Sequence, residues 1–439
     1  MSITINILMA AAQIGAGDTL QLSLEQAVAR AMEANPSLLA VQAEARAAAE
    51  LPRQASQAFL PSITVDLNAI RTNDPVAVFG LKLRQANFTG EDLALDALNS
   101  PNPYGGWTTA AMIRQPLLVP EALYGHGAAR KASQAQAAAA RRASGATTFF
   151  VTRTYWDAQL AARQVDALDT AIAAARAHAR QAEAMHEQGL VTGLDARLAR
   201  LKASELEVRR LAAHAQAANA LSGLRTLLAL PDSVPLVLTD SLGNTTSSSC
   251  TEGAADCSLE SRADLEAYRL GAEAADLGVR SAWSSQLPAV AAFGSVGYHG
   301  QSAPWDDGSG NWMIGIGLTW PIFHGLKGVG KVRAAKAERT AAEARREAAE
   351  RQAALEVLEA ERLLDAAREG VGVAADAAAE AGEAVEHARL RYRTGAAPIT
   401  ELLDVEAAAT AARLNLVAAR RDLSVALAAL DLAYGAYDR

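Results

Sequence analysis

The sequence predicts a mixed, mainly α fold in which long coiled-coil helices are combined with four β-strands. Three observations support this fold class: an internal repeat, a long heptad pattern, and four short segments that alternate between apolar and polar residues. Half of the 439 residues are hydrophobic, but only 5% are aromatic, and alanine dominates long stretches. That composition favours closely packed helices over a bulky globular core.

The chain consists of two related halves, and this repeat governs its organisation. Each half is expected to contain, in order, a helix, a strand, a loop, a strand, a long helix, a glycine turn and a helix. The paired segments are Asn35–Leu38 with Arg262–Leu265, Leu60-Pro61 with Leu287-Pro288, Gln115–Leu118 with Trp320–Phe323, and Gly189–Asp195 with Gly395–Glu401. We therefore expect a first repeat over residues 22–230, a linker over residues 231–258 and a second repeat over residues 259–439.

The N-terminal segment, residues 1–17, is apolar and has small residues at Ala10–Ala12. It resembles the end of a secretory signal peptide without its basic region, and a terminus without fixed structure is the alternative. Cys250 and Cys257 lie in the Ser/Thr/Gly-rich linker. An oxidising compartment would let them pair across a short loop, as suits an exported protein, and two unrelated thiols are the alternative.

The long helices share one apolar seam, in which small and aliphatic residues recur at alternating steps of three and four. This is the a/d spacing of a coiled coil. The seam residues are Val151, Thr154, Ala158, Ala161, Val165, Leu168, Ile172, Ala175, Ala179 and Ala182 in the first half, and Val357, Ala360, Leu364, Ala367, Val371, Ala374, Ala378, Ala381, Val385, Ala388 and Tyr392 in the second. The helix expected from about Val329 to Arg393 would be roughly 100 Å long at about 1.5 Å per residue.

Four segments have the two-residue alternation of β-strands. The clearest is Trp312–Trp320, where every second residue is tryptophan, isoleucine or leucine, and in Ile63–Leu67 isoleucine, valine and leucine alternate with polar residues. Weaker alternation covers Trp107–Arg114 and Val290–Tyr298. We expect each strand to reach about the 9–11 residues of a tilted membrane strand, and tryptophan at both ends of one apolar face suits the two membrane interfaces. Polar loops, from about Arg71 to Gly106 and from His299 to Asn311, join the strands in pairs.

The sequence has no stretch of about 18 consecutive apolar residues, so no helix is expected to span a membrane and only a barrel would cross one. Four strands leave two open edges, and the smallest single-chain barrels need about eight strands. If these strands cross a membrane, several chains must share one barrel. Two β-hairpins that cap a water-soluble helical bundle are the alternative.

The order of these elements resembles the TolC family of outer-membrane efflux and secretion proteins, from Leu22 to Tyr434. The segments that carry the resemblance are Leu24–Ala31 with Asn35-Pro36, Leu60-Pro61-Ser62, Gln115-Pro116-Leu117, Trp320–Phe323, and Tyr392–Gly395 leading to Leu403-Asp404. Phe79–Thr89 also resembles a stretch in the first surface loop of some members. Each segment is short, but their duplicated order is specific.

The resemblance implies a homotrimer in which three chains form one twelve-stranded transmembrane β-barrel, continued by a periplasmic α-barrel of coiled-coil helices. It implies a location in the outer membrane of a Gram-negative bacterium, with outer-membrane lipid around the strands. It also implies a channel of a tripartite efflux or type I secretion system, which passively conducts substrates from an inner-membrane pump and a periplasmic adaptor (membrane fusion) protein. The resemblance implies no catalysis, no cofactor and no metal.

The two glycine turns would lie at the periplasmic tip, where Gly189 and Gly395 permit the positive φ of a tight helix reversal. In family members the helix after the second turn carries acidic rings that narrow the tunnel. By this resemblance Glu401 and Asp404, three residues apart on one helix face, would project inward and attract cations. The alternative is that both carboxylates are favoured only by the helix dipole.

Two more residues of the aperture follow from the resemblance. Asp195 matches the family's acidic position after the first turn and Tyr392 matches its aromatic partner, so a hydrogen bond between them is expected to hold the resting aperture closed. Ala397 stands where the best-known members have an arginine that links neighbouring coils. This departure indicates an aperture that opens more easily.

Other classes of function have weaker support. A net charge of −8 without a basic stripe argues against nucleic-acid binding. Gly325–Val332 nearly matches a phosphate-binding loop, but Val332 replaces the hydroxyl residue that would bind magnesium. This leaves a nucleotide-dependent enzyme as a distant rival. The seven histidines lack the spacing of metal ligands. The chief rival is a soluble coiled-coil scaffold or adaptor protein.

Overall fold

The structure, a computed structural model, describes residues 19–243, 258–305 and 308–438. It divides into two compact units, and each unit contains segments from both halves of the sequence. The helical unit comprises Met1–Ala45, Gln136–Ala267 and Glu347–Arg439, and the sheet unit comprises Arg46–Ala135 and Tyr268–Arg346. Residues 1–17, Cys250 and Cys257 lie outside the described residues, so the signal-peptide and disulfide predictions stay predictions.

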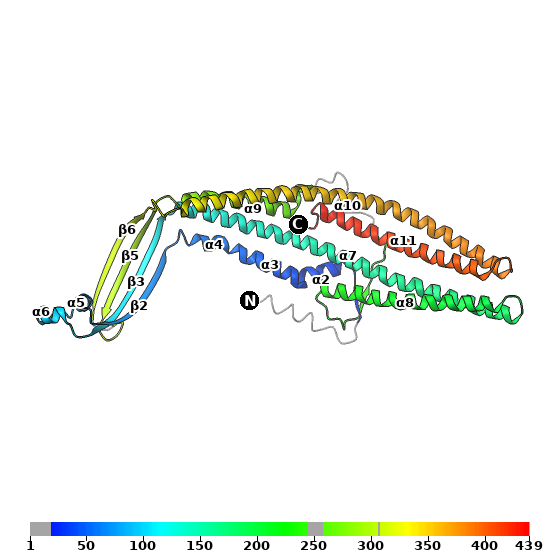
Figure 1. Cartoon of the computed structure of the whole chain (residues 1–439), viewed down its shortest axis with the longest axis horizontal. Coiled ribbons are helices and arrows are strands. Elements are labelled where there is room, and N and C mark those ends of the chain that lie inside the picture. Colours follow the sequence, from blue (N-terminus) through cyan, green and yellow to red (C-terminus); the bar gives the residue numbers. More distant parts are fainter. Residues whose placement is uncertain (1–18, 244–257, 306–307, 439) are drawn as a thin grey trace. The chain divides into compact units, whose positions relative to one another are not determined.

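The elements follow one another in the predicted duplicated order (Figure 1). The first half contains β1 (Leu20–Leu22), α2 (Leu24–Ala34), α3 (Pro36–Ala49), α4 (Leu51–Ser56), β2 (Ser62–Thr72), α5 (Pro75–Arg84), η1 (Gly90–Leu93), α6 (Leu95–Asn99), β3 (Tyr104–Leu118), α7 (Pro120–Glu187), α8 (Gly193–Leu227) and β4 (Leu236–Leu238). The second half contains η2 (Leu259–Ser261), α9 (Ala263–Ser284), β5 (Ala289–Gly300), β6 (Ser309–Thr319), α10 (Lys327–Arg393) and α11 (Ile399–Ala433).

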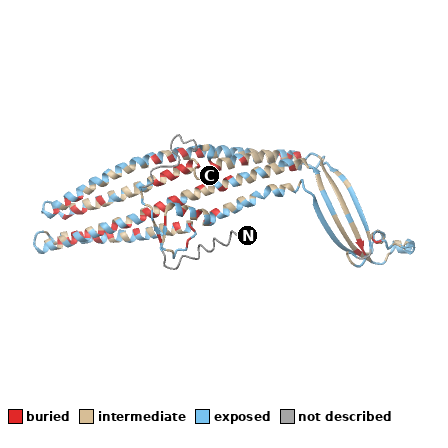
Figure 2. Cartoon of the chain, turned by 180° about the vertical axis from the view of Figure 1, so that it is seen from behind, coloured by how far each residue is buried: buried red, intermediate tan, exposed pale blue. Residues whose placement is uncertain are grey.

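The helical unit has buried stripes along its helices (Figure 2). The heptad seam is buried as predicted in the first half, where α7 packs against α8 through Val165, Leu168 and Ile172. In the second half the seam is buried at its two ends, near Leu364 and Tyr392, and only half-buried between Ala367 and Ala381. None of the described helices is both long and apolar enough to cross a membrane.

The base of the helical unit contains a core that the sequence did not predict. β1 and β4 form a two-stranded parallel sheet, and the fully buried Tyr155 donates a hydrogen bond to the Leu22 carbonyl at 3.0 Å. Leu224 and Leu228 of the α8 end complete this cluster. Tyr155 of α7 thus lies where β1, β4 and the end of α8 meet, although these segments are distant in the sequence.

A buried ionic cluster joins the C-terminal segment to the start of α9. The Arg262 guanidinium, 3% exposed, lies 2.7 Å from the Asp264 carboxylate and 2.8 Å from the Glu356 carboxylate. Asp438 accepts a hydrogen bond of 2.9 Å from the Ala263 N–H, and burial raises the pKa of its carboxyl. Arg142 lies 3.5 Å from the same carboxylate. Opposite charges therefore compensate one another around the buried Arg262 and Asp438 side chains.

The sheet unit holds one antiparallel sheet in the order β2-β3-β5-β6. The four strands cover the segments predicted from alternation, except that β6 ends at Thr319, one residue before Trp320. Their register is continuous except for a bulge between Pro116 and Leu118. β2 and β6 are the two edge strands, and neither pairs with a second described strand. The sheet therefore has two open edges, as the sequence predicted.

The long loop between β2 and β3 contains helices, although the sequence analysis predicted only a polar loop. α5 begins at Pro75 behind the N-cap Asp74, whose carboxylate accepts a hydrogen bond of 2.7 Å from the Ala77 N–H. Gln85, at its C-terminal end, is 2% exposed and donates a hydrogen bond of 3.1 Å to the Gly300 carbonyl. Any side chain at Gly106 would collide with Gln85, so the glycine allows α5 to pack closely against the sheet.

Candidate functional site

The register of the four strands sorts their side chains into two chemically different faces. One face carries aliphatic and tryptophan side chains that are mostly exposed: Ile63, Val65 and Leu67 on β2, Ala111 and Ile113 on β3, Val296 on β5, and Trp312, Ile314, Ile316 and Leu318 on β6. Ile314, for example, is 77% exposed. So large an apolar surface marks a contact with a partner or with lipid.

The opposite face of the sheet is more polar. It carries Asp66, Thr108, Arg114, His299 and Asn311. The His299 ring lies 3.2 Å from the Thr108 hydroxyl through Nδ1 and 3.1 Å from the Asn311 amide through Nε2. Gly106 belongs to this face, so α5 and its Gln85 cover part of the polar face at the loop end of the strands. One face of the sheet thus suits hydrocarbon and the other suits water.

The two helix reversals have the same backbone structure. Gly189 and Gly395 have φ values of +72° and +73°. In each turn the N–H of the residue after the glycine bonds to the carbonyl five residues back, from Leu190 to Met185 at 2.9 Å and from Ala396 to Arg391 at 2.8 Å. This is the Schellman motif, which requires the left-handed conformation that glycine adopts without strain.

The predicted hydrogen bond between Asp195 and Tyr392 is wrong for this structure. The Tyr392 hydroxyl is buried and has no hydrogen-bond partner among the described residues. Asp195 instead accepts hydrogen bonds from the Thr192 N–H at 3.1 Å and from the Thr192 hydroxyl at 3.2 Å, which cap α8. Burial, followed by the negative charge of Asp195, raises the pKa of Tyr392. The two side chains therefore interact electrostatically without a shared proton.

The acidic pair after the second turn is already partly neutralised. Arg391, near the end of α10, lies 2.6 Å from the Glu401 carboxylate and also donates to the Ala396 carbonyl at 3.5 Å. Asp404 is exposed and makes no ion pair with a described residue. Arg391 thus links α10 to α11 beside Ala397, and the sequence analysis did not identify it.

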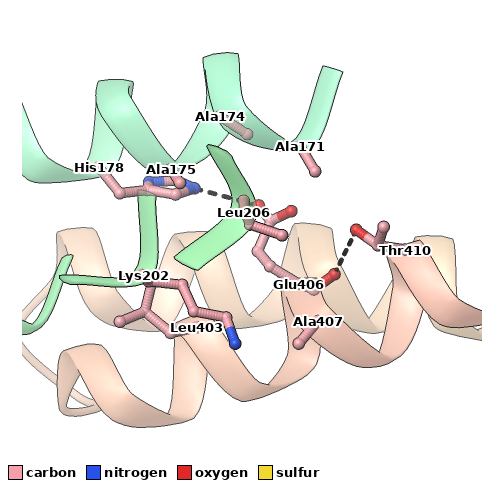
Figure 3. A pocket seen from close by; sticks show the side chains of 10 residues that line it. All are labelled: Ala171, Ala174, Ala175, His178, Lys202, Leu206, Leu403, Glu406, Ala407 and Thr410. Carbon is pink, nitrogen blue, oxygen red and sulfur yellow. Dashed lines mark hydrogen bonds and ion pairs between the residues drawn. The ribbon is translucent and has the colours of Figure 1, made fainter. Parts of the chain in front are cut away.

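A second polar cluster lies between the two helix pairs (Figure 3). The His178 ring of α7 lies 3.1 Å from the Glu406 carboxylate of α11, and Arg389 of α10 lies 2.7 Å from the same carboxylate. Burial raises the pKa of Glu406, but the hydrogen bonds from His178 and Arg389 outweigh it, so the pKa is lowered overall. A cavity of about 20 Å³, bordered by Lys202, adjoins this cluster, which is room for about one water molecule.

The glycine-rich segment that resembles a phosphate-binding loop has a different local role. Lys331, which would contact phosphate in such a loop, lies 2.5 Å from the Glu121 carboxylate. Gly325 has a φ of +63° and precedes α10. The segment therefore connects β6 to α10 in the second half. Its Lys331 forms an ion pair with Glu121 at the start of α7, which follows β3 in the first half.

The comparison with protein families decides which of the two classes, channel or soluble scaffold, this chain represents. The model for outer membrane efflux proteins matches residues 27–230 and 255–436. The chain belongs to this family. The predicted resemblance to TolC-family channels, the outer-membrane location and the role in efflux are confirmed, and the soluble scaffold is not favoured.

Solved outer-membrane channels share the fold. VceC from Vibrio cholerae is 20% identical, with a TM-score of 0.77, over 94% of this chain and 96% of that one. CmeC from Campylobacter jejuni is 17% identical, with a TM-score of 0.81, over 94% and 85% of the two chains. The open state of MtrE from Neisseria gonorrhoeae is 17% identical, with a TM-score of 0.74, over 94% and 88%. The search of the curated proteins found no match for this chain.

Proposed function

We propose that three copies of this outer membrane efflux protein close one twelve-stranded barrel, which continues into the periplasm as a helical tunnel and conducts substrates passively. The observation that carries the proposal is the pair of open edges, β2 and β6, on a sheet with one exposed apolar face. Unpaired backbone N–H and C=O groups are not tolerated in hydrocarbon, so the edges of neighbouring chains must pair. Three sheets of four strands satisfy every edge and exceed the smallest known barrels of about eight strands.

The tips of the helix pairs are the proposed periplasmic aperture. Glu401 and Asp404 are assigned to the narrow ring, where three copies would set the charge that entering solutes meet. Gly189 and Gly395 hold the reversals at the rim, while Asp195 caps α8 and Tyr392 fills the space between the helix pairs. The proposed aperture thus lies directly beside the two turns.

The proposed partners follow from the passive mechanism, because a conduit needs an energy source elsewhere. An inner-membrane pump would supply the energy and a periplasmic adaptor would seal the junction. Leu190 and Leu194 at the first tip are 65% and 61% exposed, which supports apolar docking of an adaptor there. Outer-membrane lipid would cover the apolar face of the sheet. A tripartite efflux assembly and a type I secretion system would both use these contacts.

Disulfide cross-linking between the edge strands tests the barrel. In a background that carries Cys250→Ser and Cys257→Ser, Thr64→Cys on β2 is combined with Met313→Cys, Gly317→Cys or Thr319→Cys on β6. At least one pairing should give a covalent trimer in isolated outer membranes, because these positions share the polar face. The matched control replaces Thr64→Cys by Ala110→Cys on the interior strand β3, which should give none.

Two outcomes would contradict the proposal. One is the absence of any covalent trimer with all three β6 positions, although the chain is present in the membrane fraction. The other is extraction of the chain without detergent as a stable monomer, which is the behaviour expected of the soluble scaffold. A channel should require detergent and migrate as a heat-sensitive oligomer on a denaturing gel.

A further inference from the structure

A groove of about 570 Å³ lies on the sheet at the end where β3 and β6 lead into the long helices. It is lined mainly by side chains of the polar face, among them Met112 and Arg114 of β3, Phe293 of β5 and Met313 of β6. Pockets that hold small organic molecules typically have volumes of about 300–1,000 Å³. The groove is therefore large enough for a ligand with one or two rings.

The walls of this groove are apolar although they belong to the more polar face. The Phe293 ring lies across Gly315, where any added Cβ would collide with it, and also reaches toward Gly317. Met112 and Met313 are 43% and 54% exposed beside it. An aromatic face flanked by thioethers packs well against flat hydrocarbon rings, since methionine adapts its shape and sulfur contacts aromatic edges favourably.

The charge in the groove is a single cation. Arg114 is exposed, and its guanidinium makes no ion pair with a described residue. Asp66, the acidic side chain of the same face, lies four residues along β2 from Ser62, the strand partner of Arg114, which is about 13 Å at about 3.3 Å per residue. The described side chains that line the groove include no carboxylate. The guanidinium is thus available to an anion from the lumen.

We propose that this Arg114–Phe293 groove binds amphiphilic organic anions, with a carboxylate or sulfonate on Arg114 and an aromatic body on Phe293, as they pass through the barrel. This inference rests on the proposed function, because only a shared barrel turns the polar face into the wall of a channel. Arginine suits the role because its planar group donates two parallel hydrogen bonds to such an anion. A low-affinity site at each of three positions would concentrate this class of substrate in the lumen without trapping it.

The test is the transient block of current through single channels in a planar bilayer. Naphthalene-2-sulfonate is added to one side, and block events are compared with those caused by methanesulfonate and by (2-naphthylmethyl)trimethylammonium. The wild-type channel should be blocked by the aromatic anion and far less by either control. Arg114→Gln should shorten the blocked time about tenfold, equivalent to about 1.4 kcal/mol, and Phe293→Leu several-fold. Asp66→Asn, on the same face but outside the groove, should leave it nearly unchanged.

Failure of this inference differs from failure of the proposed function. Absence of channels from purified wild-type protein would remove the conduit itself. Channels of normal conductance whose block is equally long with Arg114→Gln would overturn the groove alone. Equal block by methanesulfonate would also overturn it, because a diffuse positive potential without an apolar wall would treat the two anions alike.

Discussion

Removing both acidic side chains of the aperture should reverse the ion selectivity of the channel. In each chain Arg391 is paired with Glu401, while Asp404 stands alone. These three residues contribute one positive and two negative charges, so three chains give the ring a net charge of about −3 at low ionic strength. The double variant Glu401→Ala with Asp404→Ala leaves only the guanidiniums, and the net charge of the ring becomes about +3.

The assay is the reversal potential across a planar bilayer under a potassium chloride gradient. Wild-type channels should prefer cations, the double variant should prefer anions, and Asp404→Asn alone should be nearly unselective. Arg391→Gln is the informative control, since it frees the Glu401 carboxylate and should increase cation preference. Salt near 0.1 M is required, because the Debye length is about 10 Å there and about 3 Å at 1 M.

Two results would contradict this assignment of charges. A double variant that remains as cation-selective as the wild type would show that the two carboxylates do not face the conducted ions. An unchanged selectivity in Arg391→Gln would show that the ion pair is open in the assembled channel. Loss of folding is not expected to confuse the result, because an exposed ion pair of this kind stabilises a protein by about 0–1 kcal/mol.

Three further predictions concern stability, and each is measured by thermal unfolding in detergent followed by circular dichroism. Gly395→Ala should destabilise the helical unit by about 1 kcal/mol, because a residue with a Cβ resists the left-handed conformation. Arg262→Ala should cost about 3 kcal/mol, because it leaves the carboxylates of Asp264 and Glu356 without their buried partner. The stabilisation that ionised Glu406 contributes should be complete above its ordinary pKa of 4.5, and it should be lost as the pH falls through the lowered pKa of the folded state. Glu406→Gln should therefore reduce the dependence of the unfolding temperature on pH in this acidic range.

Matched controls separate these effects from general damage. Gly370→Ala lies in α10, where an added Cβ meets open space, and should be neutral or stabilising. If Gly395→Ala unfolds at the same temperature as Gly370→Ala, the strain argument is wrong. Recovery of full stability by Arg262→Met would mean that the cluster is replaceable by apolar packing. A pH profile unaltered by Glu406→Gln would place the acid transition elsewhere.

Most of the fold was predictable because its signals are local and repeated. The four strands alternate with a period of two, and the edges follow from counting them. The α10 helix begins at Lys327 and ends at Arg393, within two residues of the prediction, and the heptad seam from Val357 to Tyr392 covers its second part. The glycine turns were equally readable, since Gly189 and Gly395 each interrupt an otherwise unbroken helical pattern.

The missed features depend on contacts between distant residues. The pairing of His178 with Glu406 joins residues 228 positions apart, and no spacing rule anticipates it. The Asp195–Tyr392 hydrogen bond was predicted from resemblance alone, whereas the local capping contact with Thr192 takes up the carboxylate. Helix α5 did have a readable signal, because Asp74 before Pro75 is a strong helix start, but the surrounding loop composition concealed it.

The two-faced register of β3 limits how such a strand evolves. Inserting or deleting one residue before Arg114 would turn this guanidinium toward the hydrocarbon and bring Ile113 into the water, together with every side chain beyond them. Inherited length changes should therefore occur two residues at a time, or in the connecting loops. The bulge between Pro116 and Leu118 accommodates one extra residue of β3. It lies at the end of the strand that leads into α7, where the side chains no longer need to alternate between the two faces of the sheet.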